Sequence, residues 1–270
     1  MKFNALRIFV PALVVLTVFQ NLPVRADEIQ SICSDRPGLG TSTCTVDQGH
    51  WQVELGLFDA SLQHRGGVTT DFTTVVDPTI KYGLSGSVDL EASIALNEGI
   101  RIHDALSRVT ENSVGDVFLN AKWNPHPGGE AAFRWILDPF IKLPTASHEL
   151  GNGKLEAGLL VPMSYEFDDG WSLDSTPEAD MLANETDNAY HFALVDVIGI
   201  GRNLSENLSL CAELWTSQDF GPDGTISQYS LGPALAWLSD ANTQFDGGFA
   251  VGLNRQTPDL EFYAGISRRF

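Results

Sequence analysis

Apolar and polar residues alternate along most of the chain from Trp51 to Phe270, its last residue. Successive side chains of a β-strand point to opposite faces, so this period of two predicts strands with one apolar and one polar face. In the closing stretch "DLEFYAGISRRF", Leu260, Phe262 and Ile266 fall on one face between mostly polar neighbours. The same pattern predicts twelve strands, at residues 50–58, 72–83, 87–96, 115–124, 130–143, 154–165, 171–176, 189–200, 207–217, 226–238, 243–253 and 259–270.

The connections between the predicted strands alternate in length. Long ones are expected at 59–71, 97–114, 144–153, 177–188 and 218–225, and short ones between them, with "NRQTP" at 254–258 as a short exception. An even number of strands with alternating long and short loops is typical of an exported up-and-down barrel. The sequence therefore predicts an all-β fold, a transmembrane antiparallel β-barrel of about 12 strands spanning 49–270. A soluble β-sandwich is the alternative, since it also has alternating strands.

Aromatic residues stand beside the short turns, on the apolar face. They are Tyr82, Trp123, Tyr165 and Trp237. Rings with one polar edge favour the boundary between lipid and water, so these positions predict an aromatic girdle on the periplasmic side. Core aromatics near strand ends are the alternative interpretation.

Charged residues recur in mid-strand on the polar face, which in a barrel lines the lumen. Acids outnumber bases there, and rings of acids in an open channel favour cations or neutral polar solutes over anions. In a plugged interior the same groups would pair with one another. The sequence leaves open and plugged lumens as alternatives. The candidate lumen-lining residues are Asp77, Lys81, Asp89, Glu91, Asp116, Lys122, Arg134, Asp138, Lys142, Glu213, Asp246 and Glu261, with Glu54 and Glu156 on the same face.

The N-terminus has the composition of a secretory signal. Lys2 and Arg7 precede the apolar run 8–19, and "PVRA" predicts cleavage after Ala26. Removal of residues 1–26 takes away three positive charges and no acid, so the formal charge falls from −19 to −22. Such a charge repels nucleic acid, and we expect no nucleic-acid partner. Residues 27–48 are then expected as a periplasmic segment that precedes the barrel.

The cysteines and the histidines give little information about function. Export places Cys33 and Cys44 in an oxidising compartment, where a disulfide between them is a candidate, and Cys211 is left over. The six histidines lack metal-ligand spacing, and no nucleotide-binding or serine-hydrolase motif is present. The nearest hydrolase-like combination is His191 with Ser209 or Ser227. We therefore expect no enzyme activity, no cofactor and no metal.

The N-terminal block resembles a known family. "DRPG" at 35–38, "GTST" at 40–43 and "GHWQVELG" at 49–56 are similar to the opening of the outer-membrane family named for the meta-pathway of phenol degradation, whose members are described as transporters. The likeness continues in order through "PTIKYGLSGSVDL" (78–90), "VGDVFLNAKW" (114–123), "IKLPTA" (141–146) and "NLSENLSLCAEL" (203–214). The resemblance implies an outer-membrane barrel that passes aromatic or other small organic compounds. It also implies that the barrel assembly machinery reads the terminal Phe270, although Arg268 stands where members commonly have tyrosine.

The sequence and the resemblance together predict an outer-membrane channel or transporter for small organic molecules. The expected partners are outer-membrane lipid, the assembly machinery and an unidentified permeant. A plugged barrel with a structural or binding role, and a barrel-embedded enzyme that acts on lipids, are the alternatives.

Overall fold

A computed structural model describes residues 31–127, 131–147, 150–184 and 186–270. The expected signal peptide, residues 1–26, lies outside the described residues. The described chain forms antiparallel β-strands, and no helix in it is long and apolar enough to cross a membrane. The strands are β1 (Trp51–Arg65), β2 (Val68–Ser85), β3 (Val88–Ile94), β4 (Asn97–His103), β5 (Arg108–Ser113), β6 (Val117–Trp123), β7 (Phe133–Trp135), β8 (Asp138–Leu143), β9 (Glu156–Leu160), β10 (Met163–Glu166), β11 (Trp171–Ser175), β12 (Glu178–Ala183), β13 (Tyr190–Ser205), β14 (Leu208–Gly221), β15 (Gly224–Asp240), β16 (Thr243–Gly252) and β17 (Leu260–Arg269).

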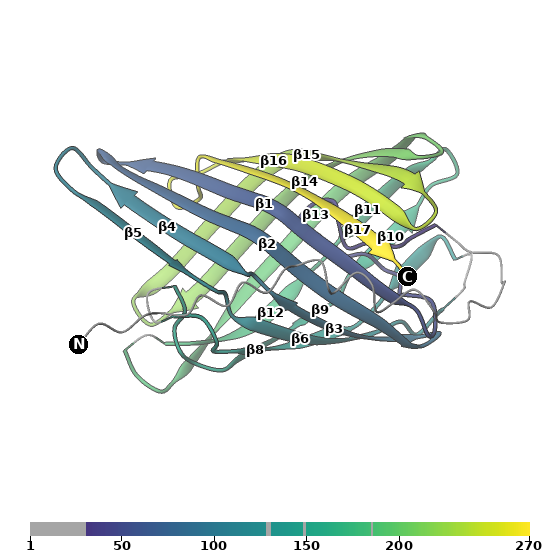
Figure 1. The fold of residues 1–270 in the computed structure, drawn as a ribbon, viewed down its shortest axis with the longest axis horizontal. Coiled ribbons are helices and arrows are strands. Elements are labelled where there is room, and N and C mark those ends of the chain that lie inside the picture. The colour runs from purple at the N-terminus through teal and green to yellow at the C-terminus, as the bar shows by residue number, and fades with distance from the viewer. Residues whose placement is uncertain (1–30, 128–130, 148–149, 185) are drawn as a thin grey trace, which may run out of the picture.

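The strands close into a twelve-stranded barrel (Figure 1). Five passes through the wall are each divided into two strands: β3 with β4, β5 with β6, β7 with β8, β9 with β10, and β11 with β12. The other seven passes are single strands. Because β1 pairs with both β2 and β17, the sheet has no open edge at its ends, and the predicted fold class and strand number are confirmed.

The start of the first strand, β1, and the end of the last strand, β17, meet at one rim of the barrel, which we call the terminal rim. The amide of Phe270 donates to the carbonyl oxygen of Trp51 at 2.7 Å, so the first and last strands begin and end side by side there. The opposite rim, called the far rim, carries the turn at Gly66 and Gly67. Figure 1 shows β1, β2, β4 and β5 reaching furthest in that direction.

Several predicted long connections are strands in the structure. Residues 59–71 continue β1 and β2 to a two-residue turn, where Gly66 and Gly67 have φ values of 59° and 84° that favour glycine. β4 and β5 make up most of residues 97–114, and β14 and β15 extend to Gly221 and Gly224. The sequence pattern did not predict these strand segments, because near the far rim polar residues occupy both faces of the strands, as in "RVTENS" of β5.

The interior of the barrel is polar and its exterior is apolar. Lys122 and Asp89 are each 1 % exposed, whereas Phe192 on the outer face is 64 % exposed. This arrangement is the reverse of a water-soluble sandwich, whose buried face is apolar. It is the arrangement expected of a barrel that contacts lipid with its outer face.

Candidate functional site: a loop inside the barrel

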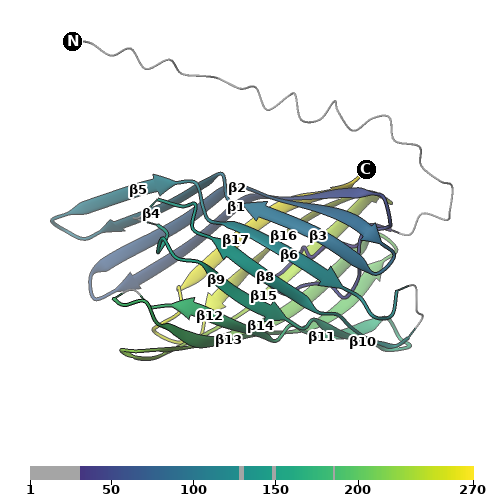
Figure 2. The ribbon, with the colours of Figure 1, turned by 90° about the horizontal axis from the view of Figure 1, so that it is seen from below.

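Residues 31–48 run inside the barrel as a loop that enters and leaves at the terminal rim; we call this loop the plug. The amide of Ile32 donates to the carbonyl oxygen of Ala241 at 2.7 Å, in the turn between β15 and β16. At the other end of the plug, Arg269 pairs with Asp47 at 2.8 Å. The segment expected to precede the barrel thus fills the half of the lumen near the terminal rim. Figure 2 shows the barrel from a second direction.

A disulfide between Cys33 and Cys44 closes the plug into a ring, with the two Cα atoms 6.3 Å apart. The residues between them, 34–43, make most of the plug's polar contacts with the wall. A short covalent ring limits the conformations that the plug can adopt when it is not docked, so the disulfide favours the docked state.

Asp35 is the centre of the plug's ion pairs. Its carboxylate lies 2.6 Å from Nζ of Lys122 on β6 and also contacts Nζ of Lys81 on β2. Lys81 is shared with Glu54 at 2.7 Å and with Glu91 at 3.7 Å. Burial alone would raise the pKa of Asp35, but the two lysines hold it well below its usual range. The plug carboxylate therefore neutralises two lysines that are almost fully buried in the wall.

Arg36 links the plug to another sector of the wall. Its Nη2 lies 2.8 Å from Oδ1 of Asp246 on β16, whose side chain has no exposed surface, and its Nε donates to both carboxylate oxygens at 3.1 Å. Several hydrogen bonds from one guanidinium to one carboxylate fix its orientation as well as its position. Asp35 and Arg36, neighbours in sequence, thus hold the plug to separate parts of the wall.

Glu213 on β14 receives the tip of the plug. Its carboxylate accepts hydrogen bonds from the amides of Leu39 at 2.9 Å and Gly40 at 3.4 Å. Gly38 precedes them with a φ of 93°, and a Cβ atom there would collide with the Glu213 carboxylate. A glycine is therefore required for the plug to present its backbone amides to the wall.

A cavity of about 210 Å³ remains between the plug and the wall formed by β11, β13 and β14. The wall side of this cavity is made of small side chains, among them Ser172, Gly199, Gly201, Ser209 and Cys211. The plug side includes Thr41 and Ser42. The plug thus fills the terminal half of the lumen unevenly and leaves space along this sector.

The half of the lumen towards the far rim is lined by carboxyl groups. Asp59 lies beside Glu261, close enough for the two carboxyl groups to interact. Glu178 and Asp180 form a second neighbouring pair. Lys142 in this half pairs with Asp116 at 3.1 Å and Glu156 at 2.7 Å.

The candidate lumen residues divide into three groups in the structure. Lys81, Asp89, Glu91, Lys122, Asp138, Glu213 and Asp246 lie around the plug, and Asp89 accepts the amide of Val46 at 2.7 Å. Asp116, Lys142 and Glu261 lie towards the far rim, whereas Asp77 lies beside Arg36 of the plug. Arg134 lies at the terminal rim, where it pairs with Glu166.

Asp35 and Arg36 are functional residues that the sequence pattern did not predict. Their pattern, two charged residues before Pro37 in a turn-rich stretch, carries no periodicity that assigns them to a face. The signal that could have found them is the requirement that the buried lysines of the wall have acidic partners.

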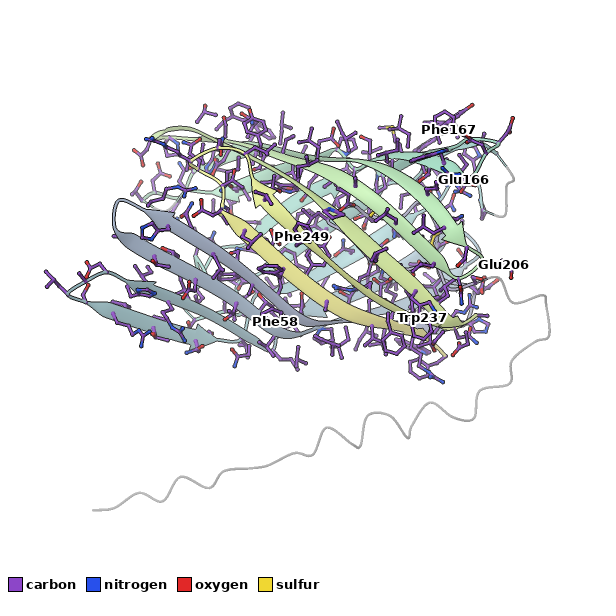
Figure 3. The ribbon with its side chains drawn as sticks, turned by 90° about the horizontal axis from the view of Figure 1, so that it is seen from above. Phe58, Glu166, Phe167, Glu206, Trp237 and Phe249 are labelled. Atoms are coloured by element: carbon purple, nitrogen blue, oxygen red, sulfur yellow. A yellow bond between two sulfur atoms is a disulfide. The ribbon has the colours of Figure 1, made fainter. Side chains whose placement is uncertain are left out.

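The aromatic residues near the terminal rim form pairs on the outer surface. Ring centroids lie 4.7 Å apart for Trp51 and Tyr82, and 5.7 Å apart for Trp237 and Phe245. Trp123 with Trp135 and Tyr165 with Phe167 form two further pairs. Figure 3 shows Phe167 and Trp237 near this rim and Phe58 and Phe249 further along the outer wall.

The last residues follow the predicted alternation. Glu261 and Tyr263 face the lumen, whereas Arg268 points outward with its guanidinium carbon 5.6 Å from the centre of the Phe270 ring. An arginine at this level can direct its charge towards the water beyond the rim.

The hydrolase-like combination does not assemble. His191 lies 2.9 Å from Asp219 near the far rim, whereas Ser209 pairs with Asn203 near the terminal rim. Ser227 donates its hydroxyl to Gln218 at 2.6 Å. Among the described residues, no group of three or more histidine, cysteine, aspartate or glutamate side chains is placed to hold a metal ion.

A comparison with protein families identifies the family of this chain. Residues 34–270 match the family described as "Putative MetA-pathway of phenol degradation". The chain belongs to this family. The match includes the plug from residue 34 onward and the whole barrel, in agreement with the resemblance noted in the sequence. No match was found among curated proteins.

Solved structures with the same fold are outer-membrane proteins. This family member is similar to an outer membrane channel from Pseudomonas putida F1, with a TM-score of 0.64 and 13 % identity over 92 % of this chain and 100 % of that chain. It is also similar to the NanC porin (TM-score 0.51, 8 % identity, 81 % and 98 % of the chains) and to the translocator domain of the autotransporter NalP from Neisseria meningitidis (0.53, 12 %, 83 % and 90 %). At these identities the likeness shows the fold, an outer-membrane barrel.

Proposed function

We propose that this protein is an outer-membrane channel for small organic molecules and that the plug restricts its periplasmic half. Outer-membrane barrels are inserted from the periplasm, and both ends of their chains lie on that side. The terminal rim is therefore periplasmic and the far rim extracellular. In the same proposal, residues 1–26 are removed during export.

The observation that carries the proposal is the way in which the lumen is filled. The plug is held by ion pairs and hydrogen bonds from Asp35, Arg36 and the amides near Gly38, rather than by an apolar core. Along β11, β13 and β14 a cavity lined by small side chains remains beside it. Polar contacts can be exchanged for water at low cost, so such a plug suits a restricted passage better than a permanent seal.

The family description supports small aromatic compounds as permeants, and the charges of the lumen support a preference for cations or neutral solutes. Nothing in the geometry of the described residues calls for covalent chemistry, so the proposal includes no enzyme activity. A plugged barrel with a structural or binding role is the rival hypothesis.

The test is conductance in planar bilayers. Wild-type protein should give small, steady currents, and a variant without residues 31–46 should give currents several times larger, because the plug occupies much of the lumen cross-section. Wild-type and variant channels of equal conductance would contradict the assignment of residues 31–48 as the restriction. If neither conducts after many insertions, the rival hypothesis of a closed barrel is favoured.

A matched pair of substitutions tests the passage itself. Ser209→Trp places a large ring in the cavity beside the plug and should reduce the wild-type current. Ile200→Trp, between Gly199 and Gly201 on β13, does not line the cavity and points to lipid, so it should leave the current unchanged. Swelling of liposomes in sugars, amino acids and aromatic acids would then identify the permeant class.

A further inference from the structure

The hairpin of β4 and β5 carries a basic outer face beyond the apolar part of the wall. β4 pairs with β2 on one side and with β5 on the other, and Figures 1 and 2 show this hairpin extending past the body of the barrel. Among described residues, β5 pairs with β4 alone. The hairpin therefore extends the wall as a flap with two accessible faces.

The register places the basic residues on the lipid side of this flap. Phe58 and Val75 are paired and exposed on the outer face of the barrel, and Asp71 is four residues beyond Val75, so it lies on the same face. Asp71 pairs with Arg101, and the carboxylate lies 3.8 Å from its guanidinium. Directly paired residues of neighbouring strands point to the same side, so Arg101 faces outward as well.

The next row of the ladder adds three basic residues to that face. His103 is paired with Arg108 on β5, and on the other side with Thr69 of β2. Thr69 is paired in turn with His64, whose Nδ1 lies 3.0 Å from the Thr69 hydroxyl. The outer face of the flap, with His64 at the end of β1, thus combines two arginines and two histidines with the carboxylate of Asp71, in a chain with a net charge of −19. Asp104 lies beside His103, and the Asp259 carboxylate accepts a hydrogen bond from the His64 amide, so two further carboxylates border this face.

The other face of the flap is different. Ile100, Ile102 and Val109 alternate with the basic residues along β4 and β5 and therefore point towards the barrel axis. The basic residues are thus gathered on one side, rather than scattered over a solvated hairpin.

The height of this face matches the headgroup region of the outer leaflet. Tyr82 marks the aromatic level near the terminal rim, and Asp71 is eleven residues along the same strand. With about 3.3 Å per residue and a tilt of about 40°, that separation corresponds to about 28 Å along the membrane normal. The apolar band of an outer-membrane barrel is about 25 Å tall, so Asp71 and Arg101 stand just beyond it.

We propose that this face, formed by Arg101, Arg108, His64 and His103, binds the phosphate groups of an outer-leaflet lipid. Arginine presents a planar array of donors that matches a phosphate group, and Arg108 has no ion pair with a described residue. The face lies outward, at headgroup height, and presents two arginines on an otherwise acidic protein. The proposal rests on the orientation adopted under Proposed function, in which the far rim is extracellular.

Binding of a diphosphorylated glucosamine lipid, lipid A, to the detergent-solubilised full chain tests the proposal. The test variant is Arg101→Ser with Arg108→Ser. The matched control is Arg134→Ser with Arg202→Ser, which removes two arginines at the terminal rim. Each basic side chain at a lipid surface contributes to the free energy of binding, and loss of two should therefore weaken lipid A binding roughly 30-fold. The control should bind as the wild type does, and a heat-modifiability gel should show that both variants are folded.

Three results would overturn the proposal. The first is equal binding by the test variant and the wild type. The second is equal binding of lipid A and its dephosphorylated form, which would assign the contact to the acyl chains. The third is displacement of lipid A by inorganic phosphate at the same concentration, which would assign the face to a free anion. Because this assay measures lipid binding and the channel test measures conductance, failure of one leaves the other interpretable.

Discussion

In the half of the lumen near the terminal rim, Asp35 and Glu54 contact Lys81, whereas in the other half Asp59 and Glu261 are acidic neighbours with no base between them. The first half compensates its carboxylates with lysines and with Arg36 of the plug. The second half places carboxyl groups beside one another, as in the pairs Asp59 with Glu261 and Glu178 with Asp180. The comparison indicates that the plugged half is built to hold a segment of chain, and the open half to present negative charge to whatever enters.

The largest expected effect comes from the charge at the centre of the plug. Asp35→Asn removes the carboxylate shared by Lys81 and Lys122 and leaves two buried lysines with fewer acids. Breaking a buried pair in this way costs about 3 kcal/mol, so the docked plug should open about 100-fold more often. Hydrogen exchange of the amides at 38–46, followed by mass spectrometry, measures this opening.

The matched control for this change is Asp47→Asn, in the same segment. Asp47 pairs with the buried Arg269, but the Asp47 side chain is 49 % exposed and Arg269 keeps its hydrogen bonds to Asn242, so loss of the pair should cost about 1 kcal/mol. Its effect on exchange should be several-fold at most. Equal acceleration by both variants would mean that the ion pairs around Asp35 do not distinguish this half of the lumen.

Removal of the disulfide should have a smaller effect. In Cys33→Ala with Cys44→Ala the undocked plug gains conformational freedom, which should favour opening by roughly 2–3 kcal/mol. The same amides should exchange faster, and conductance should fluctuate more. Cys211→Ala is the control. A reducing agent should reproduce the effect in the wild type and have no effect on the double variant; a response of the double variant would count against the disulfide as the cause.

The smallest effect is expected from the other half of the lumen, and it should appear in selectivity rather than in stability. Asp59→Asn with Glu261→Gln removes one acid pair without leaving a buried base, so cation preference should fall while the fold is retained. Reversal potentials in a salt gradient measure this change. Glu206→Gln, on a turn at the terminal rim (Figure 3), is the control. An unchanged reversal potential would show that these carboxyls do not face the permeating ions.

Much of the wall could be predicted because its pattern is local. Alternation identified all twelve passes, and it placed Lys81, Lys122 and Glu261 on the inner face. It underestimated β1, β2, β4 and β5 near the far rim, because polar residues such as Asp71 and Arg101 replace apolar ones on the outer face there. Aromatic residues such as Tyr82 and Trp237 could also be placed near the turns, because position along a strand follows from residue number.

The plug could not be placed in this way. Asp35 meets Lys81 and Lys122 across 46 and 87 residues, and Arg36 meets Asp246 across 210. The sequence by itself determined the alternation, the inward acids and the terminal strand that closes the barrel, because each depends on neighbours in the chain. The tertiary structure decided that residues 31–48 lie within the lumen and which lysines they neutralise, because a buried charge is satisfied by whatever partner the closed wall brings within reach.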